Sequence, residues 1–183
     1  MKILIDNAVA RLARGEVICI PTDTIYGFAA KPGFEEKIFE LKQRPKTNPL
    51  VLFLDSVDSL PQFIREIPPG GKDLMEAHWP GPLTLVLPGI FVETLAIRIP
   101  DHPLILSLLK ETGPLFVTSA NLSGTPPLLT APEIEHSFGT HFPILEGTVP
   151  KQGLPSTILS YKEHFWKVDR LGALTKWVIP VIV

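Results

Sequence analysis

Two short polar segments each follow an apolar run directly, which is where ligand-binding loops begin in many α/β proteins. Residues 21–27 (PTDTIYG) come after the run Val17–Ile20, and residues 119–124 (SANLSG) come after Leu115–Thr118. Hydroxyl and carboxylate side chains can orient a polar substrate, and small residues let backbone N–H groups approach an anion closely. The alternative is a pair of polar turns whose side chains bond their own backbone.

A cluster of basic side chains is a second candidate functional site. Lys42, Arg44 and Lys46 lie at and just beyond the end of a helical pattern, where cations also complement the helix dipole. As a polyphosphate clamp, Arg44 would bind two oxygens at once and Lys42 would act as a point charge. The sequence leaves the solvated helix end and the clamp open.

Arg98 is a guanidinium among apolar neighbours in the alternating stretch 97–101 (IRIPD). An arginine in that setting needs an anionic partner, either Asp101 or the carboxylate of a ligand. Near the C-terminus, Ser156 and Thr157 add a pair of hydroxyls and Arg170 adds another cation. Each of these later positions is a weak signal when taken alone.

Several common catalytic motifs are missing from the sequence. The stretch Gly70–Asp73 lacks both the upstream glycine and the Ser/Thr of a P-loop, and no dinucleotide-binding glycine pattern follows a strand. The five histidines show no metal-ligand spacing, and no nucleophile elbow supports an acyl-transfer triad. We therefore predict no metal site in the protein and no organic cofactor, and we interpret the single cysteine, Cys19, as a core residue.

The amino-acid composition is typical of a globular protein and has no strong charge bias. The 183 residues include 17 basic and 19 acidic side chains, a net charge of −2, and 45% are hydrophobic. This balance excludes disorder as the main state and gives no bulk attraction to nucleic acid, so any RNA contact must be local. No apolar run approaches the roughly 20 residues that span a bilayer. We expect one cytoplasmic domain over residues 1–183, with no membrane contact.

Hydrophobic periodicity predicts short helices between apolar strands, beginning with a helix capped by Asp6 and stopped at Gly15. The predicted helices are Asn7–Arg14, Glu35–Lys42, Val57–Phe63, Lys72–His78 and Pro103–Glu111, and the predicted strands are Val17–Ile20, Leu50–Leu54, Leu83–Leu87, Leu95–Arg98, Leu115–Thr118, Ser156–Leu159 and Phe165–Val168. Their order favours the α/β (α+β) class, with a twisted mixed sheet flanked by helices.

In order along the chain, the polar segments match a known family. The matching strings are PTDTIYG at 21–27, KQR at 42–44 with Asn48-Pro49-Leu50, WPGPLTLVL at 79–87, IRIPDHP at 97–103, TSANLSG at 118–124, PSTI at 155–158 and RLGA at 170–173. With these strings the chain resembles the YrdC-like family of threonylcarbamoyl-AMP synthases in its short, single-domain form. The resemblance implies a sheet folded around an open cavity that binds ATP, L-threonine and bicarbonate or CO2.

Transferred position by position, the resemblance implies two sets of binding residues. The threonine set is Thr24, Arg98, Ser119 and Ser156, and the ATP set is Lys42, Arg44, Asn48, Thr94, Asn121, Thr130 and Arg170. At Thr130 the spacing from Asn121 is one residue longer than the family pattern. Phe53 stands where many members carry a histidine of the threonine pocket, which leaves that pocket one polar contact poorer.

The implied reaction joins a carbamate of threonine to AMP. The amine and CO2 give the carbamate, a carbamate oxygen attacks the α-phosphate of ATP, and pyrophosphate leaves. The protein then has to position the reactants and offset phosphate charge, a catalytic task that suits Lys42 and Arg44 together with Mg²⁺ bound to ATP. The product, threonylcarbamoyl-AMP, is passed to separate enzymes that modify adenosine 37 of tRNA.

A non-catalytic RNA-binding module is the alternative function, because some family members are described as binding double-stranded RNA. It would use a basic patch of Lys31, Lys37, Lys42, Arg44 and Lys46. The net charge, the absence of RNA-binding motifs and the acids beside the patch count against tRNA or other RNA as the main partner. Binding that falls steeply with added salt and needs no threonine would distinguish this function.

The clamp assignment predicts the effect of Arg44→Ala. Removing one charge-assisted contact of this kind commonly costs roughly 10²–10³ in rate, so pyrophosphate formation should nearly stop while the fold stays intact. Turnover at the wild-type rate, with an unchanged circular dichroism spectrum, would exclude Arg44 from the clamp.

Overall fold

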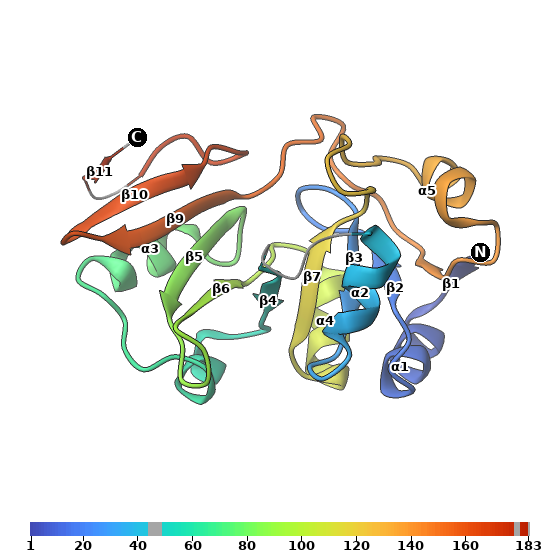
Figure 1. The fold of residues 1–183 in the computed structure, drawn as a ribbon, viewed down its shortest axis with the longest axis horizontal. Coiled ribbons are helices and arrows are strands. Elements are labelled where there is room, and N and C mark those ends of the chain that lie inside the picture. The colour runs from blue at the N-terminus through green and yellow to red at the C-terminus, as the bar shows by residue number, and fades with distance from the viewer. Residues whose placement is uncertain (44–48, 178–179, 183) are drawn as a thin grey trace.

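The computed structural model describes residues 1–43, 49–177 and 180–182, and one twisted mixed sheet runs through them (Figure 1). Its strands are β1 (Lys2–Ile3), β2 (Ile18–Ile20), β3 (Gly27–Ala30), β4 (Val51–Phe53), β5 (Leu83–Pro88), β6 (Thr94–Arg98), β7 (Leu115–Ser119), β8 (Ile144–Leu145), β9 (Thr157–Lys162), β10 (Phe165–Arg170) and β11 (Val181–Ile182). Their order in the sheet is β1-β8-β2-β3-β7-β4-β6-β5-β9-β10-β11. In the middle, β4 pairs parallel to β6 and antiparallel to β7.

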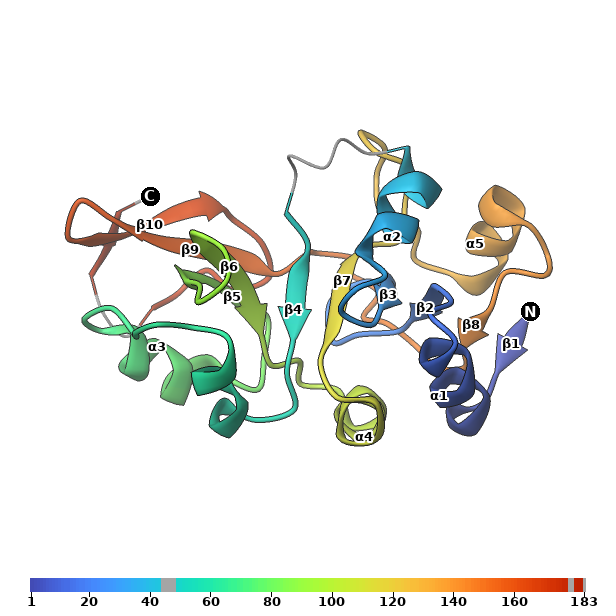
Figure 2. The same ribbon diagram turned by 60° about the horizontal axis from the view of Figure 1, so that its bottom comes forward.

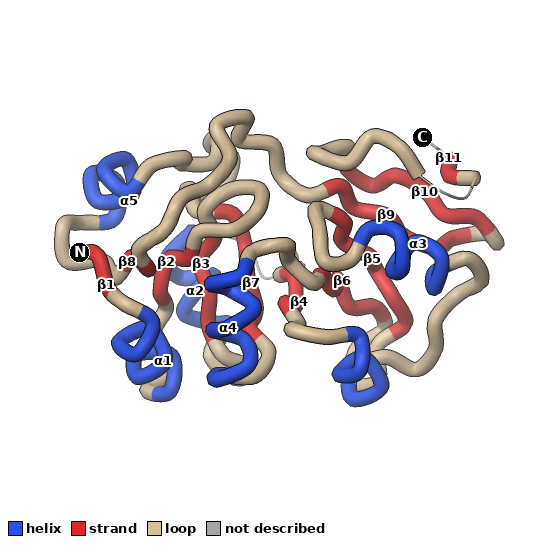
Figure 3. Tube along the Cα trace, turned by 180° about the vertical axis from the view of Figure 1, so that it is seen from behind, coloured by secondary structure: helices blue, strands red, loops and turns tan. Residues whose placement is uncertain are grey.

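Helices cover both faces of the sheet. They are α1 (Ile5–Ala13), α2 (Glu35–Lys42), α3 (Gly71–His78), α4 (Pro103–Thr112), α5 (Ala131–Phe138) and the 3-10 helix η1 (Val57–Gln62). Helices α1 and α4 lie on one face, whereas α2 and α5 lie on the other (Figure 2). From behind, α3 and α4 both lie in front of the sheet (Figure 3). Over the described ranges, no helix has the length and apolar character to cross a membrane.

Among the apolar clusters of the described residues, the two largest pack η1, α1, α3 and α4 onto the sheet, and β4 contributes to both. The first, around Leu74, packs η1 and α3 against β5, β6 and β9, and the second, around Leu12, packs α1 and α4 against β2 and β7. Because successive side chains of a strand point to opposite faces, Leu52 joins the first cluster and Phe53 joins the second. This short strand therefore links the two halves of the molecule (Figure 1).

Most of the predicted elements are present, and the predicted α/β class with a mixed sheet is confirmed. Helix α2 spans the predicted residues 35–42, and the apolar runs at 50–54, 83–87 and 115–118 form β4, β5 and β7 with slightly different ends. Cys19 is the core residue that the sequence predicts: it is fully buried, and burial raises the pKa of its thiol.

Two local predictions are wrong. Asp6 does not cap the first helix, because α1 begins at Ile5 and its N-cap residue is Leu4, which makes no side-chain hydrogen bond. Asp6 lies instead in the first turn, where its charge favours the positive end of the helix dipole. Residues 57–62 form a 3-10 helix rather than an α-helix, with Pro61 removing a backbone donor inside it.

Five elements of the described structure were not predicted: β1, β3, β8, α5 and β11. Strands β1, β8 and β11 have two residues each, too few to show a period. Strand β3 (GFAA) is buried throughout and so has no alternation. For α5 a signal was available, because Thr130 and Glu133 form a capping box at its start.

Candidate functional site

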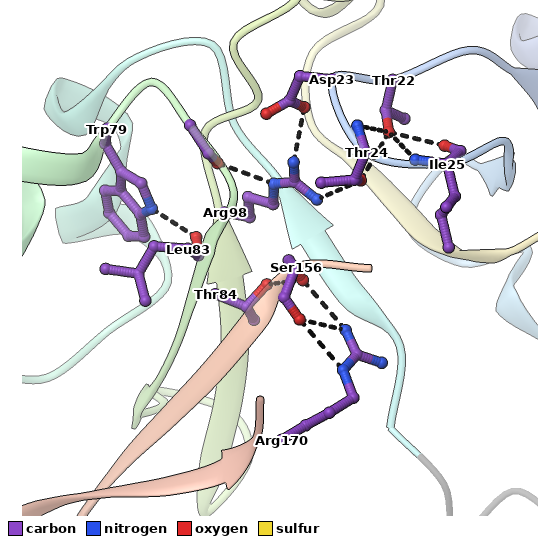
Figure 4. A network of polar contacts seen from close by, with 11 residues as sticks. Thr22, Asp23, Thr24, Ile25, Trp79, Leu83, Thr84, Arg98, Ser156 and Arg170 are labelled. Atoms are coloured by element: carbon purple, nitrogen blue, oxygen red, sulfur yellow. Dashed lines mark hydrogen bonds and ion pairs between the residues drawn. The ribbon is translucent and has the colours of Figure 1, made fainter. Parts of the chain in front are cut away.

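Residues from several of the polar segments line one hollow of about 230 Å³ beside β4, in the middle of the sheet (Figure 4). Its walls come from the loop after β2, from β4, from the ends of β6, β7 and β10, and from the start of β9. Five of the residues predicted for the site line this hollow: Thr24, Arg98, Ser119, Ser156 and Arg170. The fold therefore gathers residues that are far apart in the sequence.

The loop after β2 satisfies its own backbone through Thr22. The Thr22 hydroxyl donates to the carbonyl of Ile25 (2.7 Å) and accepts from the backbone N–H groups of Thr24 (3.1 Å) and Ile25 (3.2 Å). This is the self-bonded polar turn that the sequence offered as an alternative. The turn is compatible with ligand binding, because it leaves Asp23 and Thr24 to face Arg98 (Figure 4).

Arg98, at the end of β6, is the centre of the polar cluster, and only 3% of the residue is exposed. Its Nε donates to the carbonyl of Gly81 (3.0 Å), Nη1 to Thr24 Oγ1 (3.0 Å) and Nη2 to Asp23 Oδ1 (2.6 Å). The pairing with Asp101 offered by the sequence is wrong, because Asp101 is exposed and Asp23 supplies the compensating charge. Burial lowers the pKa of the Arg98 guanidinium, and the Asp23 carboxylate opposes that shift.

Arg98 retains hydrogen-bonding capacity for a ligand. A guanidinium has five N–H groups, and three of those of Arg98 are bonded within the described residues. One N–H group on each terminal nitrogen is left, which suits the two oxygens of a carboxylate. The Phe53 ring, whose centroid is 5.5 Å from Arg98 Cζ, supports the guanidinium by a cation–π contact.

The hydroxyl of Thr24 offers the hollow an acceptor. Thr22 uses its proton on the carbonyl of Ile25, so Thr24 is the donor in the 2.9 Å contact between the two threonine hydroxyls, and the two lone pairs of Thr22 are shared among this hydroxyl and the two backbone N–H groups. Thr24 Oγ1 also accepts from Arg98. One lone pair remains on this side chain, which lines the hollow, and a lone pair suits an N–H group of a ligand.

Ser156 and Arg170 form a second polar contact at the hollow (Figure 4). Arg170 donates to the Ser156 carbonyl from Nε (3.1 Å) and Nη2 (2.8 Å), and Nη2 also lies 3.1 Å from Ser156 Oγ. The Ser156 hydroxyl is 2.8 Å from that of Thr84, a fully buried residue of β5. The two hydroxyls meet because β5 and β9 pair from Leu83 and Thr157 onward.

Lys42 is buried, although the sequence offered it as a phosphate ligand or part of a solvated helix end. Only 1% of the residue is exposed, and Nζ donates to the carbonyls of Ser119 and Asn121 and to Asn121 Oδ1 (2.9 Å). The Ser119 hydroxyl donates to the same Oδ1 (2.6 Å), and the Asn121 amide donates to Leu122 and Thr125. Neither Lys42 nor Asn121 is among the described residues that line the hollow. Together they hold the loop that presents Ser119.

The structure describes two of the other predicted ATP residues, Thr94 and Thr130, and brings neither of them to the hollow. Thr94 is exposed at the start of β6, at the opposite end of the strand from Arg98. Thr130 is exposed and caps α5, accepting from the N–H group of Glu133 (3.3 Å). Neither threonine lines the hollow as described. Arg44 and Asn48 lie outside the described residues.

Sequence reasoning missed two residues that organise the site. Asp23 was part of a candidate loop but was not recognised as the partner of Arg98. Thr84 was counted as part of an apolar strand and of the matching string at 79–87, and no role of its own was predicted for it. A signal existed for Thr84, because it is the one polar side chain in the run LTLVL at 83–87, and a buried hydroxyl needs a partner.

A larger hollow of about 490 Å³ lies between η1 and α3. Its described lining contains none of the predicted site residues and includes the apolar side chains of Leu60, Ile64 and Met75. We place the candidate site at the smaller hollow, because convergent donors and acceptors, rather than volume, orient a polar substrate. Across the described ranges, no three His, Cys, Asp or Glu side chains gather as metal ligands.

Comparison with known proteins extends these observations. The family model for Sua5, YciO and YrdC, described as "Telomere recombination", matches residues 10–172. The chain belongs to the Sua5/YciO/YrdC family. The resemblance found in the polar segments is therefore confirmed.

Relatives within the family match most of the chain. The Bacillus subtilis relative, named threonylcarbamoyl-AMP synthase, is 37% identical over 98% of this chain, which spans 56% of that relative's length. A relative of the same name from Klebsiella pneumoniae is 35% identical over 83% of this chain and 88% of its own length. Sua5 from Pyrococcus abyssi, solved with L-threonine, has a TM-score of 0.87 and 32% identity over 93% of this chain and 54% of its own.

The burial of Lys42 predicts a loss of stability in Lys42→Met. Methionine keeps the length of the side chain but leaves the oxygens of Ser119 and Asn121 without their charged donor, so the free energy of unfolding should fall by about 2–4 kcal/mol. Urea unfolding measures this change. Lys72→Met, at an exposed position of α3, is the matched control. An unchanged unfolding midpoint in Lys42→Met would show that Lys42 does not hold this loop.

Proposed function

We propose that this protein is an L-threonylcarbamoyl-AMP synthase, a nucleotidyltransferase that converts L-threonine, bicarbonate or CO2, and ATP to threonylcarbamoyl-AMP and pyrophosphate. The observation that carries the proposal is the hollow around Arg98, which combines donors for a carboxylate with an acceptor for an amine. Relatives named threonylcarbamoyl-AMP synthase and the complex of P. abyssi Sua5 with L-threonine support it.

The hollow suits the amino-acid substrate in size and polarity. Its volume of about 230 Å³ lies below the roughly 300–1,000 Å³ of pockets for drug-sized ligands. In the proposed complex, the remaining N–H groups of Arg98 bind the threonine carboxylate, and Thr24 accepts a hydrogen bond from the amine. Apolar side chains of β4 and β7, Phe53 and Val117, complete the lining and can contact the threonine methyl group.

ATP is proposed to bind beside the amino acid, near the exposed Arg170 at the end of β10. Arg44, with Asn48, is assigned to the phosphates on the family resemblance alone, as are Thr94 and Thr130 to the nucleotide. Lys42 contributes by holding the loop of Ser119 and Asn121. We propose that Mg²⁺ arrives bound to the phosphates of ATP, its usual mode of binding in proteins that use nucleotides.

The proposed reaction asks the protein to position reactants rather than to form a covalent intermediate. The threonine amine attacks CO2 and loses a proton, and an oxygen of the resulting carbamate attacks the α-phosphorus of ATP. The new P–O bond forms as the bond to pyrophosphate breaks. Arg98 and Ser156 keep the amino acid in place, while Arg44 and Arg170 offset the charge on the phosphates.

The biological setting is part of the same proposal. Residues 1–183 would act as one cytoplasmic domain, and the product would be consumed by separate enzymes that modify adenosine 37 of tRNA. The RNA-binding alternative is weakened by two described members of its basic patch. Lys42 is buried, and Lys37 Nζ donates to the carbonyl of Gly15 (2.7 Å).

An activity assay tests the proposed function. Purified protein is incubated with ATP, Mg²⁺, bicarbonate and L-threonine, and pyrophosphate and threonylcarbamoyl-AMP are followed, the latter by mass spectrometry. We expect both products only when threonine is present. Pyrophosphate without the adenylate would contradict the proposal, as would a folded protein that is inactive but binds double-stranded RNA at low salt.

The role of Arg98 predicts a selective defect in Arg98→Lys. Lysine keeps a positive charge beside Asp23 but lacks the planar fork that binds a carboxylate, so the Kd for threonine should rise about tenfold or more while that for ATP changes less than about twofold. Calorimetry with each ligand measures both constants. Arg65→Lys, at an exposed arginine beside the larger hollow, is the control. Equal losses for the two ligands would show that Arg98 supports the fold rather than threonine.

A further inference from the structure

The hydroxyl of Thr84 has a single hydrogen-bond partner among the described residues, the hydroxyl of Ser156 at 2.8 Å. Thr84 lies in β5 with 0% of the residue exposed, whereas Ser156 lines the hollow. In a contact between two hydroxyls either oxygen can be the donor. The direction of this hydrogen bond decides whether the Ser156 hydroxyl can still donate a proton to a ligand.

Burial decides the direction of this hydrogen bond. With Ser156 as donor, the Thr84 proton would have no acceptor in a position closed to water, and an unpaired buried donor is costly. With Thr84 as donor, the Thr84 hydroxyl is satisfied and the Ser156 proton stays available. The hydrogen bond therefore runs from Thr84 to Ser156.

Arg170 supplies a second donor to the same oxygen. Its Nη2 lies 3.1 Å from Ser156 Oγ, so Ser156 Oγ accepts from both Arg170 and Thr84 (Figure 4). A serine hydroxyl has two lone pairs and one proton. With both lone pairs in use, Ser156 is left to act toward the hollow as a donor.

We propose that Thr84 is a positioning residue that makes Ser156 a hydrogen-bond donor to an anionic oxygen of the amino-acid substrate, which is its carboxylate when ATP is absent. The proposal rests on the proposed function and deepens it. Thr84 touches no substrate and acts through Ser156. Thr24 complements this arrangement, because its remaining lone pair accepts an N–H group, so the two hydroxyls recognise opposite ends of one amino acid.

Binding of L-threonine to a matched pair of variants tests the role of the Thr84 hydroxyl. Thr84→Val removes the hydroxyl and keeps the branched shape, whereas Thr84→Ser keeps the hydroxyl and removes the methyl group. We expect Thr84→Val to weaken threonine binding about 2- to 10-fold in calorimetry, the range for one hydrogen bond, and Thr84→Ser to bind nearly as tightly as wild type. Thr84→Ala replaces Thr84→Val if valine prevents folding.

A double-mutant cycle with Ser156→Ala separates positioning from a structural effect. If Thr84 acts through Ser156, adding Thr84→Val to Ser156→Ala should cause no further loss of threonine affinity. Losses that multiply in the double variant would overturn the proposal. So would wild-type affinity in Thr84→Val, or equal losses in Thr84→Val and Thr84→Ser, which would assign the effect to packing.

The same titrations distinguish this inference from the proposed function. A folded wild-type protein that does not bind L-threonine would overturn the proposed function, and the inference with it. Wild-type binding of threonine that is insensitive to Thr84→Val would overturn the role of Thr84 alone. Weaker binding of L-threoninamide than of L-threonine by wild type, with the difference reduced in Thr84→Val, is the result expected if the carboxylate is the acceptor.

Discussion

One buried ion pair, between Arg98 of β6 and Asp23 in the loop after β2, determines the arrangement of the site. The two residues belong to opposite halves of the sheet, on either side of β4, and their 2.6 Å contact joins the halves at the hollow. Burying either charge alone is strongly unfavourable, so each requires the other, together with the added bonds from Arg98 to Gly81 and Thr24. The position of β6 relative to the loop is therefore fixed by electrostatics as well as by packing.

The same principle operates at three other polar residues that line the hollow, Thr24, Ser156 and Ser119, because a neighbouring residue holds each of them in place. Thr22 bonds the backbone of the turn and contacts the hydroxyl of Thr24, and the hydroxyl of Thr84 contacts that of Ser156. Lys42 holds the loop of Ser119 through charged hydrogen bonds. Supporting contacts of this kind hold binding groups in one geometry, so a substrate does not have to order them when it binds.

The elements that position the site were largely predictable from the sequence, whereas the contacts between them were not. Long apolar runs bounded by glycine or proline identified β4, β5 and β7, and the polar motifs with the family resemblance identified five of the residues that line the hollow. The partners Arg98 and Asp23 are 75 positions apart, and Thr84 and Ser156 are 72 apart. Periodicity describes the faces of one element and contains no strand order, so it could not show that β9 lies beside β5. For Lys42, residue type and position indicated a cation at the end of a helix, but tertiary packing decides where a long side chain points.

The ion pair also affects which ligands suit the site. Because Asp23 already neutralises Arg98, a simple carboxylate would add net negative charge beside this buried ion pair, whereas a zwitterionic amino acid adds none. Its carboxylate is attracted to Arg98 and its ammonium to the side of Asp23 and Thr24. In the proposed reaction the ammonium loses its positive charge and becomes an anionic carbamate. The carbamate is then repelled by Asp23 and attracted toward cations such as Arg170, where the nucleotide is proposed to lie. The charge arrangement that favours binding of the amino acid therefore also directs its activated form toward the phosphate.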